Sequence, residues 1–164
     1  MRLAVSGISR SGKDTIVNYL VKTRGMKHFA LASKVKQIAT DFYGIPGEAY
    51  YEANPEERNR IIYNGQTAVD LWIKVTKVIK AHDPEYFARF TPCGDNIAIS
   101  DLRFKEEYNF LKRVGYKFIR VIRPGVVSDR PTDHELDDAH FDATIINDGS
   151  LEDLYAKVDL LYRR

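Results

Sequence analysis

The chain has 164 residues, of which 44% are hydrophobic and 29% charged, a balance typical of a globular protein with one full core. Its net charge of +2 lacks the strong basic excess of proteins that coat nucleic acid, and its single cysteine, Cys93, excludes an internal disulfide. No apolar run is long enough for a signal peptide or a membrane span. We therefore expect one cytoplasmic domain over residues 1–164, with neither nucleic acid nor membrane as partner.

The first predicted element is a short buried strand over residues 2–6, which leads into a glycine-rich loop and then an amphipathic helix ending near Gly25. The loop reads Gly7-Ile8-Ser9-Arg10-Ser11-Gly12-Lys13-Asp14-Thr15. Its glycines let backbone N–H groups turn toward phosphate oxygens, and the helix N-terminus adds further donors. An ordinary strand-to-helix turn is the alternative, but the spacing of the glycines and the lysine favours a P-loop, which binds a nucleotide. We expect nucleotide contacts from Gly7, Arg10, Ser11, Gly12, Lys13, Asp14 and Thr15.

The end of this loop departs from the usual P-loop pattern. The common motif follows its lysine with Ser or Thr, whose hydroxyl binds Mg²⁺. Here Asp14 takes that position and Thr15 comes one residue later. We expect Lys13 to neutralise charge on the β- and γ-phosphates, and Asp14 and Thr15 to hold Mg²⁺, with Asp14 acting through water or by orienting Thr15.

The middle of the chain predicts a helical region. A second short strand over residues 28–31 is followed by a helix from Ser33 to Gly44, and Asn54-Pro55 opens another segment that runs through Tyr63. Apolar residues at helical spacing then predict a long helix ending near His82. Nothing between residues 33 and 90 resembles a strand, so we expect this region to be a helical excursion from the sheet.

Basic residues in this helical region could bind a second phosphate. A kinase must hold the acceptor's phosphate as well as the donor's, and four cations are available: Lys34, Lys36, Arg58 and Arg60. Charged residues on helices are commonly solvent-facing, which is the alternative for each one taken singly. Trp72 could stack on an acceptor base, although an aromatic residue at helical spacing is more often part of a core. We assign acceptor binding to Lys34, Arg58 and Trp72.

The strand predicted over residues 96–101 ends in a carboxylate, with a guanidinium two residues later. In parallel α/β sheets, ligands gather at the carboxyl ends of the strands. We expect Asp101 to hold Mg²⁺ directly or through water, and Arg103 to grip a phosphate as a bidentate fork. A solvated ion pair at the end of a strand is the alternative.

The last third of the chain alternates helix and strand, with a helix over residues 105–114, strands over 117–122 and 144–146, and a terminal helix capped by Ser150. Residues 123–140 are largely polar and aperiodic, which favours a lid over phosphates, with a mobile surface loop as the alternative. Arg123 and Arg130 on this lid would meet the negative charge that spreads in the transition state. After the last strand, Asn147 and Gly149 could pack against a donor base, although a helix-capping turn explains the same residues.

The order of these elements predicts an α/β fold, a parallel sheet with helices on both faces. The chain also resembles the deoxynucleoside monophosphate kinases of tailed bacteriophages. The motifs that carry this resemblance are the P-loop with Lys-Asp-Thr, Ala30 to Lys36, Ile99 to Phe104 followed by Glu107, Asp133-His134-Glu135, and Asn147 to Leu151.

This resemblance implies transfer of the γ-phosphoryl group of ATP to a deoxynucleoside 5′-monophosphate, with Mg²⁺. It implies a three-layer P-loop kinase fold whose five-stranded parallel sheet has the order 2-3-1-4-5, with an acceptor-binding region over 33–90 and a lid over 123–140. It places Arg103 and Lys34 at the acceptor and Arg123 and Arg130 at the lid. The expected partners are nucleotides, with a homodimer left open, and the location is the host cytoplasm if the chain is viral.

Two alternatives to this function remain. The first is a kinase with another small acceptor, such as dephospho-coenzyme A, which uses a similar architecture. The second is a non-catalytic nucleotide-binding module. A guanine-selecting Asn-Lys-x-Asp motif, which would favour a nucleotide switch, does not occur in the chain.

Overall fold

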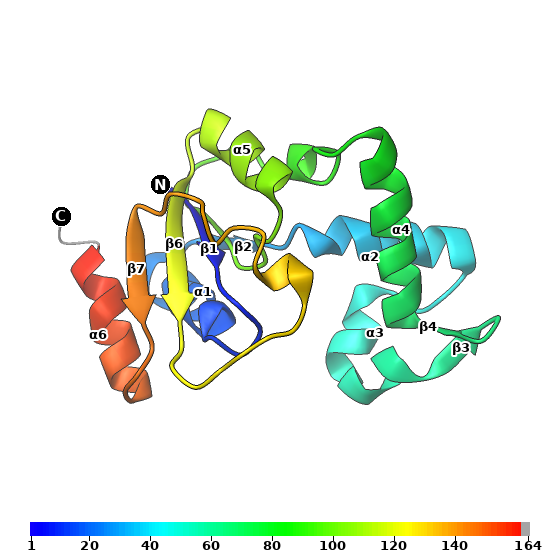
Figure 1. The fold of residues 1–164 in the computed structure, drawn as a ribbon, viewed down its shortest axis with the longest axis horizontal. Helices are drawn as coiled ribbons and strands as arrows, with labels where there is room; N and C mark the ends of the chain where they lie inside the picture. The colour runs from blue at the N-terminus through cyan, green and yellow to red at the C-terminus, as the bar shows by residue number, and fades with distance from the viewer. Residues whose placement is uncertain (162–164) are drawn as a thin grey trace. The chain divides into compact units, whose positions relative to one another are not determined.

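The computed structural model describes residues 1–161, and the chain divides into two compact units. One unit comprises Met1–Ala30 together with the chain from Thr91 onward and contains the main sheet. The other comprises Leu31–Phe90 and is mainly helical. The two units are described separately below, with the element labels of Figure 1.

The first unit is built on a parallel sheet of five strands in the order β2-β5-β1-β6-β7. Counted within this sheet alone, the order is 2-3-1-4-5, so the predicted fold class is confirmed. Ala4 of the central strand pairs with Ile99 on one side and Phe118 on the other. The strands are β1 (Arg2–Ser6), β2 (Lys27–Phe29), β5 (Ile97–Ile99), β6 (Lys117–Ile122) and β7 (Ala143–Ile146).

Helices cover both faces of this sheet. The helices α1 (Lys13–Arg24) and α6 (Leu151–Leu161) share one core with β1, β6 and β7, which includes Ile16, Val121 and Leu154. Alternate strand residues point to the opposite face, where Phe118 packs its ring against Tyr108 of α5 (Lys105–Arg113), with ring centroids 4.3 Å apart. The result is the three-layer arrangement that the alternating sequence pattern predicts.

The second unit packs three helices around its own core. They are α2 (Ala32–Tyr43), α3 (Glu48–Ala53) and α4 (Ala68–His82). The side chain of Thr67 caps α4 by accepting a hydrogen bond from the backbone N–H of Asp70. The core contains Val35, Ala39, Ile45, Tyr51, Ala68, Leu71, Val75 and Phe87. None of the helices described, including the 15 residues of α4, is both long and apolar enough to cross a membrane.

Two predictions for this unit are wrong. A hairpin of β3 (Ile61–Tyr63) and β4 (Gln66–Thr67) lies in the region where we expected no strand. The segment opened by Asn54-Pro55 forms only the short 3-10 helix η1 (Pro55–Asn59). The physical cause is the turn at Asn64-Gly65, where φ is 44° and 75°: two positive φ angles in succession favour a tight hairpin, and β-branched residues precede them.

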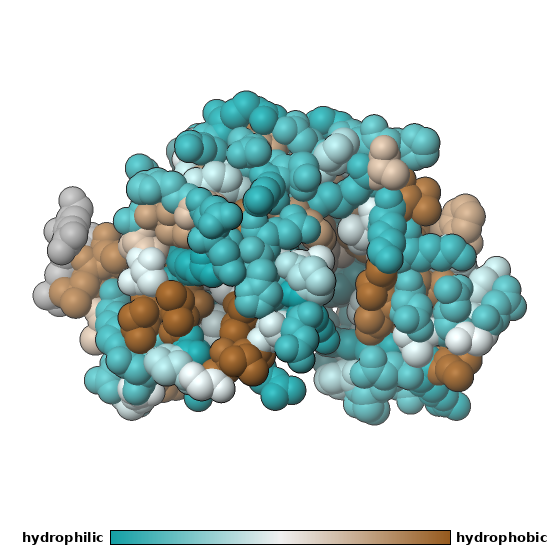
Figure 2. All heavy atoms as spheres, viewed as in Figure 1, coloured by the Kyte–Doolittle hydropathy of each residue, from teal (hydrophilic) through white to brown (hydrophobic). Residues whose placement is uncertain are grey.

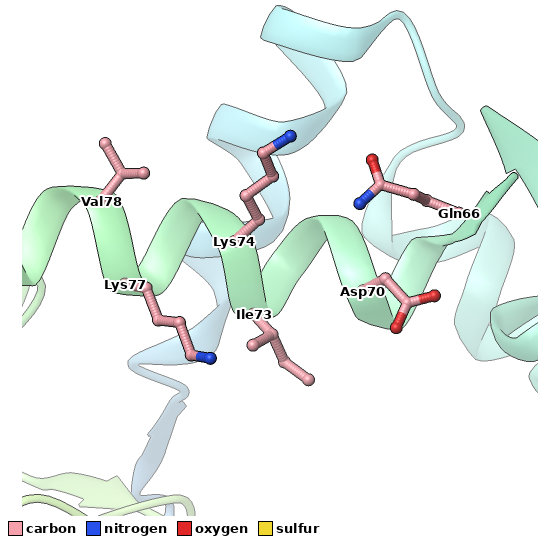
Figure 3. A pocket seen from close by; sticks show the side chains of 6 residues that line it. All are labelled: Gln66, Asp70, Ile73, Lys74, Lys77 and Val78. Atoms are coloured by element: carbon pink, nitrogen blue, oxygen red, sulfur yellow. The ribbon is translucent and has the colours of Figure 1, made fainter. Parts of the chain in front are cut away.

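A pocket of about 420 Å³ runs along α4 in the second unit. Figure 3 shows its lining, in which Asp70, Ile73 and Lys77 project from the same side of the helix. The remaining lining residues are Gln66, Lys74 and Val78. None of the residues predicted to bind an acceptor lines this pocket.

Candidate functional site

The P-loop follows β1, and its glycines lie where neighbouring atoms leave no room for a side chain. A Cβ added at Gly7 would lie 2.5 Å from the backbone oxygen of Val121 on β6. A Cβ at Gly12 would lie 2.6 Å from the Nδ2 atom of Asn147, and φ at Gly12 is +105°, a value that L side chains rarely adopt. The loop therefore packs closely against the end of β6 at Gly7 and against the Asn147 side chain at Gly12.

Asn147, which follows β7, holds the backbone of the P-loop by a hydrogen bond. Its Nδ2 donates a hydrogen bond of 2.8 Å to the backbone oxygen of Ser11, and its own backbone N–H donates to the oxygen of Ile122 at 2.7 Å. Gly149 leaves room for the cap of the next helix. A Cβ there would lie 2.5 Å from a carboxylate oxygen of Asp153, and this carboxylate accepts hydrogen bonds from the backbone N–H and hydroxyl of Ser150. Both residues thus have a structural task apart from any contact with a base.

Lys13 lies within the curl of the loop, with 5% of its surface exposed. Its Nζ donates to the backbone oxygen of Ile8 at 3.3 Å. Burial lowers the pKa of this ammonium below its ordinary value, while the nearby carboxylates of Asp14, Asp133 and Asp101 offset part of that effect. The one buried ammonium therefore lies among three carboxylates, which stabilise its charged form.

The three predicted Mg²⁺ ligands differ in their surroundings. Asp14 and Thr15 belong to the first turn of α1, where Asp14 is exposed and Thr15 is half-buried. Asp101 is half-buried and follows β5. Residues 1–161 contain no group of three or more His, Cys, Asp or Glu side chains arranged to hold a metal alone. Mg²⁺ in kinases is bound by one or two carboxylates together with substrate phosphates, and these oxygen donors fit that requirement.

The segment carrying Asp101 and Arg103 is tied to the P-loop. The hydroxyl of Ser6, the last residue of β1, donates to the backbone oxygen of Leu102 at 3.1 Å, and both residues are buried. The buried carboxylate of Glu107 accepts hydrogen bonds from the backbone N–H groups of Arg103 and Phe104, at 3.3 and 3.2 Å. The start of the P-loop and the backbone at Arg103 are therefore held in one fixed relation.

One of the three carboxylates near Lys13, that of Asp133, belongs to the lid segment of residues 123–140. Its side chain is only 1% exposed, and Nη1 of Arg103 lies 3.2 Å from its Oδ1. The hydroxyl of Ser128 donates to its Oδ2 at 2.7 Å, and the backbone N–H of Ser9 in the P-loop lies close enough to favour the charged form of this carboxylate. Burial by itself raises its pKa, but these hydrogen bonds and the charges of Arg103 and Lys13 together hold the pKa below its ordinary value.

Sequence reasoning did not assign a role to Asp133. It appeared only within the weak lid motif Asp133-His134-Glu135, and no local pattern showed that it faces Arg103 and Ser9. A charged residue that stands three positions before the buried, apolar Leu136 in a polar segment is the one signal the sequence offers.

The lid segment between residues 128 and 137 is held by its own contacts. His134 bridges the backbone oxygen of Ser128, at 2.8 Å from its Nε2, and Oδ2 of Asp137, at 3.0 Å from its Nδ1. Arg120 of β6 pairs with Asp137 and donates to the backbone oxygen of Leu136. The predicted lid cations, Arg123 and Arg130, are exposed, and neither guanidinium makes an ion pair with the described residues.

The contacts of His134 predict a pH-dependent lid. Its hydrogen bond to Ser128 and its contact with Asp137 raise its pKa above 6.5. Since the folded pKa is the raised one, this contribution to stability is complete below the unfolded value and is lost as the pH rises through the folded pKa. We expect an NMR titration of the His134 ring to give a midpoint above 6.5, and Asp137→Asn to lower that midpoint. An unchanged midpoint in Asp137→Asn would contradict this account.

In the second unit, two of the predicted acceptor residues are near one another. Arg58 donates from Nε to the backbone oxygen of Tyr51 at 3.1 Å, and the rings of Tyr51 and Trp72 meet edge to face at 5.2 Å. The Tyr51 hydroxyl and the Trp72 Nε1 are buried without a hydrogen-bond partner among the described residues. Lys34 lies elsewhere, with Nζ 4.7 Å from the ring centre of Phe90. Trp72 thus packs on a core and carries an unused donor.

Apolar side chains border the carboxyl ends of β6 and β7. In Figure 2, brown spheres gather on this face near the lower ends of the two strands, among mostly hydrophilic surroundings. The exposed apolar residues of this part of the chain include Ile122, Val127 and Ile146. A surface of this kind next to a phosphate-binding loop can contact the flat face of a base.

Comparisons with known proteins agree with this geometry. The family model of deoxynucleotide monophosphate kinases matches residues 2–65. A protein of Acanthamoeba polyphaga mimivirus, provisionally named as a deoxynucleotide monophosphate kinase, is 24% identical, with 95% of this chain and 93% of that protein aligned. The resemblance to deoxynucleoside monophosphate kinases is therefore confirmed, and the relative comes from a mimivirus.

Two solved structures share the fold. Shikimate kinase from Aquifex aeolicus has a TM-score of 0.53 and TT1252 from Thermus thermophilus has one of 0.52. Each is 16% identical, and each alignment covers 99% of this chain and 96% of the other. At this identity the likeness shows the fold alone.

Proposed function

We propose that this chain transfers the γ-phosphoryl group of ATP to a deoxynucleoside 5′-monophosphate. The observation that carries the proposal is the P-loop with its buried Lys13 and, tied to it through Ser6, a second cation at Arg103. A nucleotide-binding module needs only the P-loop and its lysine. A kinase needs cations for the donor and for the acceptor phosphate, and the chain's similarity to deoxynucleotide monophosphate kinases supports that acceptor class.

The donor half of this proposal uses the P-loop. Backbone N–H groups between Gly7 and Thr15 would surround the β- and γ-phosphates, with Arg10 and Ser11 among them and Lys13 neutralising their charge. The base would lie against the apolar border that includes Ile122 and Ile146, near Asn147 and Gly149. Asp14, Thr15 and Asp101 would hold Mg²⁺. When bound, the ion neutralises charge on the phosphates.

The acceptor residues are proposed for each unit by itself, Arg103 in the first and three residues in the second. Arg58 and Lys34 would bind the phosphate of the monophosphate, as guanidinium and ammonium groups do. Trp72 would contact its base or sugar. The buried and unpaired Tyr51 hydroxyl and Trp72 Nε1 support this assignment, because polar atoms left without partners in a folded protein often await a ligand.

Catalysis would be positional and electrostatic. The acceptor phosphate oxygen is already anionic, so no residue has to remove a proton from it. Lys13, Arg103 and the lid cations Arg123 and Arg130 would stabilise the charge of the transferring group, and the lid of residues 123–140 would exclude water. We place the reaction in the cytoplasm, that of the host for a viral chain, where ATP and nucleotides are available.

A panel of acceptors tests the proposal. We expect ADP to form from Mg·ATP only when a deoxynucleoside monophosphate is added, with one base preferred among the four. Ribonucleoside monophosphates, shikimate and dephospho-coenzyme A serve as comparison acceptors. Turnover with only a non-nucleotide acceptor would replace the proposed substrate, and tight ATP binding without any turnover would replace the enzyme with a binding module.

A further inference from the structure

We propose that Asp133 is a positioning residue for phosphoryl transfer, which fixes the guanidinium of Arg103 against the P-loop. The inference rests on the proposed function and deepens it, because it concerns the cation that would address the acceptor phosphate. The carboxylate of Asp133 is buried, and the proposed phosphoryl transfer does not otherwise use it.

Both ends of Arg103 are held. Its backbone N–H donates to Glu107, which is buried at the start of α5, and its Nη1 donates to Asp133. These are the hydrogen bonds of Arg103 within residues 1–161. A guanidinium has five N–H donors, so the remaining ones stay available for phosphate oxygens. Because its backbone and its Nη1 are both held, Arg103 points the remaining N–H groups of its guanidinium in one direction.

Asp133 also contacts the loop that holds the donor. The backbone N–H of Ser9 lies close enough to the same carboxylate to favour its charged form, so a single side chain lies near both Arg103 and the P-loop backbone. Lys13 is close enough for its charge to act on this carboxylate. The carboxylate thereby offsets the repulsion between the two cations, Lys13 and Arg103, which lie near each other before any phosphate is bound.

A second reading of the same contacts is that Asp133 substitutes for a phosphate and leaves when ATP binds. The surroundings favour a fixed residue. Ser128 donates to Asp133 and its backbone oxygen contacts His134, which in turn contacts Asp137, and Arg120 joins that group to β6. Moving Asp133 away would disrupt this set of contacts together with the buried Leu136.

Asp133→Asn tests the proposal because it keeps the shape and removes the charge. We expect kcat to fall by about 10- to 100-fold, the range for the loss of one hydrogen bond between charged groups, while the Kd for Mg·ATP changes by less than about threefold. In an Arg103→Lys background, we expect Asp133→Asn to lower kcat little further than Arg103→Lys alone does. The reason is that the guanidinium fork that Asp133 positions is already absent. If the fold-losses of kcat in Asp133→Asn and in Arg103→Lys simply multiply in the double variant, the proposal is overturned.

The matched control is Asp137→Asn, which removes a carboxylate from the same segment but does not touch Arg103. An equal loss of kcat in this control would mean that only the integrity of the segment matters, and would overturn the proposal. Tighter ATP binding by Asp133→Asn at unchanged kcat would overturn it as well, in favour of a carboxylate that competes with phosphate.

A measurement on the nucleotide-free protein separates this inference from the proposed function. The side-chain ¹⁵N signals of Arg103, assigned by their loss in Arg103→Lys, should show restricted rotation in the wild type and in Asp137→Asn, and free rotation in Asp133→Asn. If no monophosphate is turned over, the proposed function fails while this result still decides whether Asp133 holds Arg103. Equal rotation of Arg103 in wild type and Asp133→Asn would overturn the inference.

Discussion

Lys13→Ala is expected to reduce acceptor-dependent ADP formation by about 100- to 1,000-fold, the range observed when one preorganised electrostatic contact to a transition state is removed. The reason is the place of the ammonium inside the P-loop, where burial removes competing water and its contact to Ile8 aims it into the curl of the loop. Steady-state rates with saturating acceptor measure the effect, and titration with Mg·ATP separates lost affinity from lost turnover.

Lys22→Ala is the matched control for that substitution. Lys22 lies in the last turn of the same helix, α1, and is exposed. We expect its rates to equal those of the wild type. Circular dichroism of both variants at equal temperatures tests whether unfolding contributes to the loss of activity. Lys13→Ala activity within tenfold of the wild type would contradict the assigned role.

The parts of the fold that the sequence predicted are those with local signals. The P-loop depends on glycines and a lysine at fixed spacing, and β5, β6 and β7 stand out as short, largely apolar runs before polar turns. The cap at Ser150 is another local signal, and its hydrogen bonds with Asp153 are present. The hairpin of β3 and β4 also has a local signal, the dipeptide Asn64-Gly65. The prediction missed it because the whole region was expected to be helical.

The site contacts that escaped prediction join residues far apart in the chain. Arg103 and Asp133 are 30 positions apart, and Asn147 supports Ser11 across 136 positions. No periodicity or spacing specifies such pairs, because they are set by which strand ends lie side by side in the folded sheet. The sequence could therefore indicate which residue types gather at this edge, while the pairing among them required the fold.

The second large effect is expected at Gly7, where a methyl group meets backbone. In Gly7→Ala the new Cβ would lie 2.5 Å from the oxygen of Val121 and 2.7 Å from the Ser11 hydroxyl. The Ser11 side chain can turn, but the Val121 oxygen is part of the central sheet, so the P-loop must shift instead. A displacement of about 1 Å at a catalytic site can cost about a hundredfold in rate, and we expect a loss of that order together with weaker ATP binding.

Gly94→Ala provides the comparison in the same unit, since a Cβ there meets nothing within 4 Å and its backbone is not in the positive-φ region. We expect it to match the wild type in rate, ATP affinity and melting temperature. Gly7→Ala should lose rate and affinity by more than any fall in melting temperature explains, because the strain is confined to the loop that holds the phosphates. Wild-type affinity in Gly7→Ala would show that the loop yields without cost, and that the close approach of Val121 does not shape the phosphate site.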